Sequence, residues 1–359
     1  MTAPAAVVEC SMPGPENSRR LYELLARSPL GADRIDQPGY AERLANALKA
    51  DLEAVLTNDI WVHGRRIQSM FEAMVVAFDH FTLIKTEDAG PLHPEDVYSL
   101  PDFRLVLKDK SQILVEVKNV WCSDPREQLF TIRTTDLEKK MRYAEATGAP
   151  LKLAIYWARW GIWTLIDPKH LRDDGASKTV TMLQAVPFNE TACFGDVTIG
   201  TRAPLTFRVE ADRTKERTIS PDGKVSMTIG AIILLCEGTA LTGLDSKLAL
   251  LLIQFGEWQG EDAVAVTDGA LVDSIEYHFN PGERPEGGPE NFDMIGHASR
   301  MFARYYSLRT VDAGRVIRTG VELEPGLFRV LTVGDGTGHS IPLWRFYLQP
   351  ATPEQVRAA

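Results

Sequence analysis

Two short apolar segments before the middle of the chain carry charged residues, and three of these could do chemistry together. Asp102 opens the segment 101–107, and Glu116 and Lys118 close the segment 113–118, fourteen positions later. Burying a charge inside an apolar strand costs free energy unless the charge is paired or holds a metal. Two carboxylates with a lysine suit a hard divalent cation such as magnesium, which activates a bound water and stabilises charge on a phosphate oxygen. This residue set therefore indicates hydrolysis of a phosphodiester.

Strands must position these side chains. The segment 113–118 is short and rich in β-branched residues, which predicts a β-strand. Because side chains alternate along a strand, Glu116 and Lys118 share one face and Val115 and Val117 share the other.

The polar residues 108–111 predict a turn between the two segments. An antiparallel hairpin with an odd-length loop centred on Lys110 would place Asp102 opposite Lys118 and Arg104 opposite Glu116. All the charged groups would then lie on one face, because a hairpin register fixes the face of every side chain.

The motif Pro101-Asp102, followed by Glu116-Val117-Lys118 at the end of a short strand, resembles the signature of the PD-(D/E)xK nuclease superfamily. That superfamily includes restriction endonucleases and Holliday-junction resolvases. Its core is a helix, three antiparallel strands, a helix and a further strand. The resemblance covers residues 62–168, where the pattern predicts elements in the same order: a helix at 64–79, a strand at 81–85, the hairpin, a helix at 135–147, and strands at 151–157 and 162–166.

The resemblance implies an α/β fold with a restriction-endonuclease-like mixed sheet flanked by helices. It implies that Asp102, Glu116 and the backbone carbonyl of Val117 bind Mg²⁺, with Mn²⁺ as a substitute, and that Lys118 positions the attacking water. Many members add an acidic residue from the first core helix. Glu72 is the matching candidate, and the alternative is that it lies on the solvated face of that helix.

Contacts to nucleic acid come largely from cations that meet phosphates. The candidates are Arg65 and Arg66 at the start of the first core helix, and Lys139 and Lys140 on the helix after the motif. A solvated helix face is the alternative for each. Family members often act as dimers, since cutting both strands of a duplex needs two sites, so we expect a possible homodimer.

The charge balance weighs against broad contact with DNA. The chain of 359 residues has a formal net charge of −10, and most of it lies in residues 171–359. An acidic protein can still bind DNA through a local basic patch and a metal. We therefore expect the acidic C-terminal region to bind a protein partner or to mediate self-association.

Composition limits the remaining possibilities. Four cysteines lie far apart, which argues against a zinc site and fits a reducing cytoplasm. The N-terminus lacks a secretory signal, and the longest apolar stretches are too short to span a bilayer. We therefore expect a cytoplasmic protein without membrane contact.

The length predicts more than one domain. We expect an N-terminal helical segment at 1–60, a nuclease-like core at 61–171, a polar boundary at 172–177, and a C-terminal α+β domain with an antiparallel sheet at 178–359. The patterns outside the core predict helices at 19–28, 40–56, 244–255 and 292–307, and strands at 205–210, 225–229, 328–333 and 343–348.

Two classes of function follow. The first is a metal-dependent endonuclease acting on DNA, with RNA left open, in which the C-terminal domain supplies specificity, partner contacts or oligomerisation. The second is a catalytically silent nuclease-fold scaffold or regulatory binding protein in a nucleic-acid-processing or defence assembly. The intact Asp102, Glu116 and Lys118 favour the first class.

Overall fold

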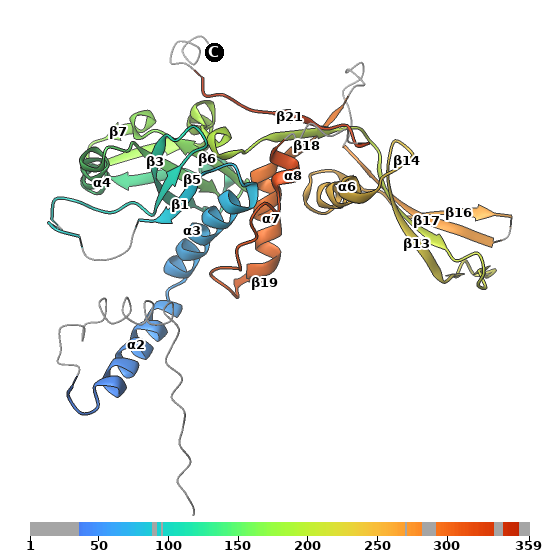
Figure 1. The fold of residues 1–359 in the computed structure, drawn as a ribbon, viewed down its shortest axis with the longest axis horizontal. Helices are drawn as coiled ribbons and strands as arrows, with labels where there is room; N and C mark the ends of the chain where they lie inside the picture. Colours follow the sequence, from blue (N-terminus) through green and yellow to red (C-terminus); the bar gives the residue numbers. More distant parts are fainter. Residues whose placement is uncertain are drawn as a thin grey trace, which may run out of the picture.

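A five-stranded mixed sheet lies at the centre of the region that carries the motif (Figure 1). The computed structural model describes residues 36–87, 92–94, 96–269, 271–281, 292–333 and 340–351. The sheet order is β1-β2-β3-β5-β6, with β3 and β5 parallel and the other neighbours antiparallel. Its strands are β1 (Leu83–Thr86), β2 (Phe103–Val106), β3 (Gln112–Val120), β5 (Leu151–Trp157) and β6 (Ile162–Ile166). The predicted α/β class and element order are confirmed.

Two helices cover opposite faces of this sheet. Helix α3 (Asp59–Phe78) shares one apolar core with Phe103 and Val115. Helix α4 (Thr134–Thr147) shares a second core with Leu114, which neighbours Val115 in β3. Because side chains alternate along β3, Val115 packs on the α3 side of the sheet and Leu114 packs on the α4 side. Glu116 and Lys118 lie on the same side as Leu114.

The ends of both helices follow from capping residues. The side chain of Asn58 accepts a hydrogen bond of 3.1 Å from the backbone N–H of Trp61, so α3 begins about a turn before the predicted residue 64. Helix α4 ends at Gly148, whose φ of 70° lies in the left-handed region that glycine tolerates, as predicted.

The β2–β3 hairpin differs in register from the prediction. Phe103 pairs with Val115, and Arg104 pairs with Leu114 rather than with Glu116. The loop is centred on Asp109, because Leu107 and Ser111 close it with a backbone hydrogen bond of 2.9 Å while Lys110 takes a φ of 70°. The shift is by two positions, which keeps every side chain on its predicted face.

The segment that we predicted as a domain boundary is part of a sheet. Strands β7 (Arg172–Asp174) and β8 (Ser177–Thr181) form a hairpin, and β8 pairs with β4 (Leu129–Arg133) of the nuclease-like region. The polar run therefore marks a tight turn rather than a linker. The division into three domains stays a prediction.

The C-terminal region contains the predicted antiparallel sheet. Its strands are β10 (Leu205–Ala211), β13 (Ile229–Cys236), β14 (Thr239–Ala240), β15 (Gln259–Gly260), β16 (Val264–Asp268) and β17 (Leu271–Asn280). A three-stranded sheet contains β9 (Thr198–Thr201), β18 (Asp293–His297) and β21 (Trp344–Phe346). Two small hairpins join β11 (Thr218–Ile219) with β12 (Val225–Ser226), and β19 (Val311–Asp312) with β20 (Arg315–Val316).

The other helical elements follow in chain order. They are the short 3-10 helices η1 (Pro125–Glu127), η2 (Pro168–His170), η3 (Val186–Phe188) and η4 (Thr191–Phe194), and the α-helices α5 (Met182–Ala185), α6 (Gly243–Phe255), α7 (Ala298–Thr310) and α8 (Arg329–Thr332).

Two of the C-terminal predictions are wrong in part. The helix predicted at 292–307 begins only at Ala298, because the preceding residues pair with β9 as β18. The strand predicted at 328–333 is the short helix α8. Its apolar residues pack against α3, and periodicity alone does not separate a short strand from a short buried helix.

Helix α3 lies between the mixed sheet and the C-terminal helices (Figure 1). The ring of Phe78 lies 6.3 Å from that of Phe302 in α7 and 6.4 Å from that of Phe328, just before α8. On its other side Phe71 contacts Phe103 of β2, with ring centroids 5.8 Å apart. The helix that borders the motif is thus held rigidly from both sides.

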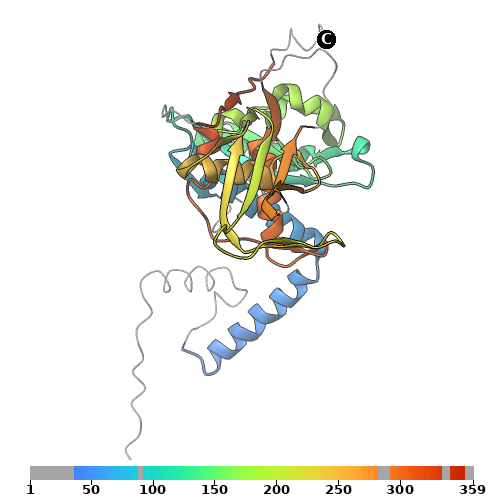
Figure 2. The ribbon, with the colours of Figure 1, turned by 90° about the vertical axis from the view of Figure 1, so that its right-hand side faces the viewer.

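Helix α2 (Tyr40–Leu56) projects away from this body (Figure 2). Its bounds are as predicted, and Leu52 on this helix is largely exposed. The helix predicted at 19–28 and most of the predicted segment 1–60 before α2 lie outside the described residues. Across the described ranges, no helix has both the length and the apolar character to cross a bilayer.

Candidate active site

The two motif carboxylates are buried at the end of the β2–β3 pairing. Asp102 directly precedes β2 and is 8% exposed, and Glu116 in β3 is 2% exposed. The last β2–β3 pair is Phe103 with Val115. Continuing that register places Asp102 opposite Glu116, on the α4 face of the sheet. The structure therefore brings the two predicted carboxylates together.

Hydrogen bonds orient the carboxylate of Asp102. Its Oδ2 accepts from the backbone N–H of Val117 at 2.6 Å. Its Oδ1 accepts from the side-chain amide of Gln68 in α3 at 2.5 Å. The first bond satisfies the N–H of Val117, which lies past the last residue of β3 that pairs with β2. The second bond connects Asp102 to helix α3.

Two lysines neutralise Glu116. Its Oε1 lies 2.7 Å from Nζ of Lys118, and its Oε2 lies 2.9 Å from Nζ of Lys140 in α4. Lys140 also donates a hydrogen bond to the carbonyl of Leu100, at 2.7 Å. Oε2 is buried and has no hydrogen-bond partner of good geometry among the described residues.

Burial and neighbouring charges shift the pKa values of Asp102 and Lys118. Burial, and then the negative charge of Glu116, raise the pKa of Asp102 from 3.8 to about 7 against the hydrogen bond from Val117 and the lysine charges. Burial opposes the charged form of Lys118, but the ion pair with Glu116 outweighs it and raises the pKa of Lys118. Lys118 is therefore a cation at neutral pH, and Asp102 takes up its proton close to neutral pH.

A pocket of about 610 Å³ opens beside Glu116 and Lys118. Its remaining charged lining comes from β4 and α4, and consists of Arg133, Asp136, Lys139 and Lys140. The cations outnumber the carboxylates in this lining. A phosphate group would therefore find a favourable local field here, although the chain as a whole is acidic.

The donor set fits a magnesium ion. Mg²⁺ usually takes one or two carboxylates and completes its shell with water and substrate oxygens. Asp102 and Glu116 supply two buried carboxylates whose mutual repulsion a dication would relieve, and Oε2 of Glu116 has lone pairs to spare. Among the described residues, no cluster of three or more His, Cys, Asp and Glu side chains is suited to a metal.

Glu72 does not make the α3 contact with the site. The described contact from α3 to Asp102 is made by Gln68, one turn earlier in the helix. Burial raises the pKa of Glu72, which interacts electrostatically with Arg65 and Tyr306. Its predicted role as a metal ligand stays a prediction.

The two arginines of α3 have different positions. Arg65 is exposed, and its guanidinium donates to Gln68 at 3.3 Å. Arg66 is buried and donates at 2.8 Å to Ser307 and to Thr310 of α7. Arg66 thus holds α3 to α7, and its predicted contact with nucleic acid stays a prediction.

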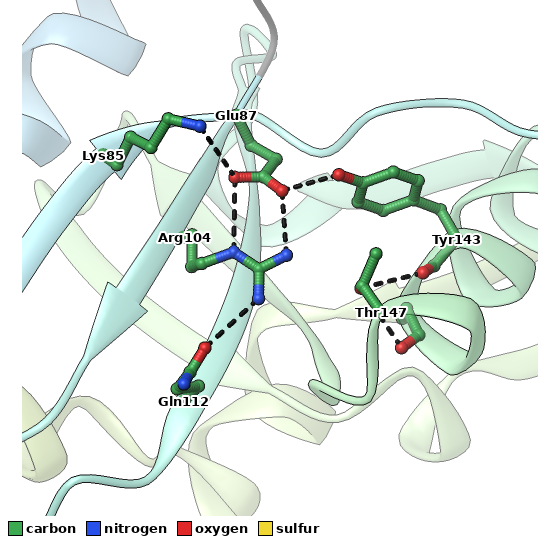
Figure 3. A network of polar contacts seen from close by, with 7 residues as sticks. Lys85, Glu87, Arg104, Gln112, Tyr143 and Thr147 are labelled. Atoms are coloured by element: carbon green, nitrogen blue, oxygen red, sulfur yellow. Dashed lines mark hydrogen bonds and ion pairs between the residues drawn. The ribbon is translucent and has the colours of Figure 1, made fainter. Parts of the chain in front are cut away.

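A buried network that we did not anticipate supports the site from the sheet edge (Figure 3). The carboxylate of Glu87 accepts hydrogen bonds from Arg104 at 2.8 Å and from the Tyr143 hydroxyl of α4 at 2.6 Å. Its backbone N–H donates to the carbonyl of Asp102 at 2.8 Å. Burial opposes the charged form of Glu87, but these bonds outweigh it and lower the pKa of its carboxyl. The network links β1, β2 and α4 around Asp102.

We named Lys140 as a candidate contact to nucleic acid and did not anticipate its ion pair with Glu116. Lys140 follows the buried Leu137 by three positions and precedes the buried Ala144 by four, which places it on the inward face of α4. Its neighbour Lys139 lies one residue off that stripe, and only lines the pocket. No sequence pattern indicates the role of Gln68. Its partner Asp102 lies in another part of the chain, 34 positions away.

Comparisons with known proteins add little. No protein-family model matches the sequence, and no curated protein matches it significantly. Among solved structures, the chain is similar to Hjc, a Holliday junction resolvase from Archaeoglobus fulgidus. The identity is 14%, the match covers 33% of this chain and 85% of that chain, and the TM-score is 0.24.

Proposed function

We propose that this protein is a metal-dependent endonuclease that hydrolyses phosphodiester bonds of DNA. The observation that carries the proposal is that Asp102 interacts with the charges of Glu116 and Lys118, and that the latter two line a cation-rich pocket. The resemblance to PD-(D/E)xK nucleases in motif and element order agrees with it.

In this proposal each residue has a separate role. Asp102 and Glu116 hold Mg²⁺ or Mn²⁺, with the carbonyl of Val117 as a further ligand. When bound there, the metal would lower the pKa of a water and stabilise charge on the phosphate. Lys118, a cation held beside Glu116 at 2.7 Å, orients the attacking water and offsets the negative charge that builds up on the phosphate.

The cations around the pocket would receive the DNA backbone. Lys139 and Arg133 line it without contributing to the carboxylate pair, so they are free in this proposal to meet phosphates. A homodimer would supply the second site that cleavage of both strands requires. Contacts of the acidic C-terminal region with a protein partner remain part of the proposal.

One observation favours a second candidate, the silent scaffold. Nζ of Lys140 lies 2.9 Å from Oε2 of Glu116 and neutralises a carboxylate that would otherwise await a metal. A fold that no longer binds metal could be stabilised in this way. Mg²⁺ must displace or share this contact for the enzyme proposal to hold.

Cleavage of supercoiled plasmid tests the two candidates. We expect cleavage with Mg²⁺ and none with EDTA, and a loss of at least about 100-fold in the Glu116→Gln and Lys118→Ala variants. The control is Glu138→Gln in helix α4, which changes a carboxylate whose side chain is 55% exposed. Undiminished cleavage by both site variants would reject the site. Failure to cleave duplex DNA, single-stranded DNA or RNA with either metal would favour the scaffold.

A further inference from the structure

A second and larger hollow adjoins the candidate active site. It measures about 1010 Å³ and is lined by the first turns of α3, the end of β3 and the end of α7. Lys118 lines both this hollow and the 610 Å³ pocket, so the two hollows meet this one residue of β3. A strand of nucleic acid with a phosphate at the candidate site would therefore have its neighbouring nucleotide at this hollow.

Two exposed indole rings lie on its wall. Trp121, just after β3, is 65% exposed, and Trp61 in the first turn of α3 is 45% exposed. Exposed apolar side chains that gather on one surface, rather than lying scattered, indicate a ligand or partner site. Flat rings beside a phosphate site are suited to stacking of nucleobases, which every base permits because each has a π-face.

The polar lining suits the rest of a nucleotide. Arg65 and His63 are exposed on the same wall, and Asp59 is the one carboxylate among the lining residues. The side-chain oxygen of Asn119 is buried at the hollow and accepts no hydrogen bond from the described residues. An exocyclic amine or ring N–H of a base would satisfy that acceptor, whereas an apolar ligand would not.

We propose that this hollow, the Trp61–Trp121 pocket, binds unpaired nucleotides of a DNA single strand next to the scissile phosphate. The proposal deepens the proposed function and rests on it for the position of the phosphate. In a duplex the bases stack on one another and their faces are covered, so the pocket selects single strands, flaps or splayed ends over continuous duplex.

Binding without cleavage tests the pocket alone. Full-length protein in EDTA is titrated with a fluorescein-labelled single-stranded 20-mer of mixed sequence, its duplex and the matching RNA, and anisotropy is recorded. We expect the single-stranded DNA to bind more tightly than the duplex. Trp61→Ala and Trp121→Ala should each weaken single-strand binding about tenfold. Trp160→Ala is the control, since Trp160 is 42% exposed but does not line the pocket.

Intrinsic fluorescence gives a second readout, because stacked bases quench indole emission. Quenching by the single strand should fall in the Trp61 and Trp121 variants and persist in the Trp160 variant. The pocket is rejected if duplex binds as tightly as single strand, if the two variants bind like the control, or if RNA binds more tightly than DNA.

The two proposals fail in different ways. Single-strand binding that depends on Trp61 and Trp121, without cleavage of any substrate, would support the pocket and reject the enzyme. Plasmid cleavage that depends on Glu116, without a single-strand preference, would support the enzyme and reject the pocket. Glu138→Gln, the control of the cleavage assay, should bind the single strand like the wild type, since Glu138 does not line the Trp61–Trp121 pocket.

Discussion

The carboxylate of Asp102 accepts a hydrogen bond of 2.6 Å from the backbone N–H of Val117. This bond joins the two halves of the motif, because Val117 lies between Glu116 and Lys118 in β3. It places the side chain of Asp102 where the next backbone carbonyl of β2 would bond if the ladder continued. The two carboxylates consequently occupy one small volume, and their charges repel.

That repulsion predicts an unusual dependence of stability on pH. Because the pKa of Asp102 is raised from 3.8 to about 7 in the folded protein, the folded state binds this proton more tightly than the unfolded state. The free energy of unfolding should therefore fall as the pH rises from about 4 to 7, by roughly 2 kcal/mol between pH 5 and pH 8 in EDTA. Urea denaturation at both pH values measures it.

Asp102→Asn is the matched variant for this experiment. It removes the titrating group, so its unfolding free energy should lack this decrease and exceed that of the wild type at pH 8. Adding Mg²⁺ at pH 8 should restore stability to the wild type and not to the variant, if the pair holds the metal. If the unfolding free energies of the two proteins changed with pH in parallel, the raised pKa of Asp102 would be contradicted.

Neighbouring lysines of α4 should differ sharply in their effect on stability. Lys140→Met leaves Oε2 of the buried Glu116 without its cation, which we expect to cost roughly 1–3 kcal/mol in the free energy of unfolding. Lys139→Met removes a cation that only lines the pocket, and should change it by less than about 0.5 kcal/mol. The midpoint of urea denaturation distinguishes them. Equal losses would mean that the ion pair to Glu116 contributes nothing.

Gln68 should matter more to activity than Glu72. Gln68→Leu removes the hydrogen bond that orients Oδ1 of Asp102, and loss of such a supporting bond typically costs about 10–100-fold in activity or metal affinity. Glu72→Gln should lower cleavage less, since the described contact to Asp102 comes from Gln68. Cleavage rates and Mg²⁺ titrations of both variants test the order. The reverse order would identify Glu72 as the ligand that we predicted from the sequence.

The Glu87 network should stabilise the fold in a pH-dependent way. Glu87→Gln breaks buried, charge-assisted bonds to Arg104 and Tyr143, and we expect it to cost roughly 1–3 kcal/mol at pH 7. The folded-state pKa of Glu87 is lowered from 4.5, so its contribution is present above about pH 4.5 and is lost as the pH falls through the lower folded value. Denaturation at pH 7 and pH 3.5 should show the difference shrinking.

Lys85→Ala is the control for that network. Lys85 approaches Glu87 only to 4.0 Å and is 67% exposed, so its removal should cost less than about 0.5 kcal/mol. A loss as large as that of Glu87→Gln would show that the exposed lysine, rather than Arg104 and Tyr143, stabilises the carboxylate.

The two adjacent arginines of α3 should separate stability from binding. Arg66→Ala removes buried bonds to Ser307 and Thr310 and should cost roughly 2 kcal/mol in the free energy of unfolding. Arg65→Ala should leave that free energy within about 0.5 kcal/mol, and should weaken DNA binding and its dependence on salt. Denaturation and salt-dependent anisotropy measure the two effects. A stable Arg66→Ala protein that loses only DNA binding would restore the role first predicted for Arg66.

Local pattern was sufficient for much of the fold. The strand at 151–157, the strand at 162–166 and the helix at 40–56 have the predicted bounds, because turn residues and side-chain periodicity mark them in the chain. The shared face of Glu116 and Lys118 follows from strand alternation alone. The helical structure of α8 could not be predicted this way, since its short apolar run fits either kind of element.

The sequence by itself determined which residues carry the candidate chemistry and on which face of β3 they lie. Only the tertiary structure decided the partners: the register that aligns Asp102 with Glu116, the choice of Lys140 over Lys139, and the contact of Gln68. The physical reason is that periodicity acts within one element, whereas these contacts join residues up to 34 positions apart through loop closure and packing. The hydrogen bond from the buried Arg66 to Thr310 of α7 joins residues 244 positions apart.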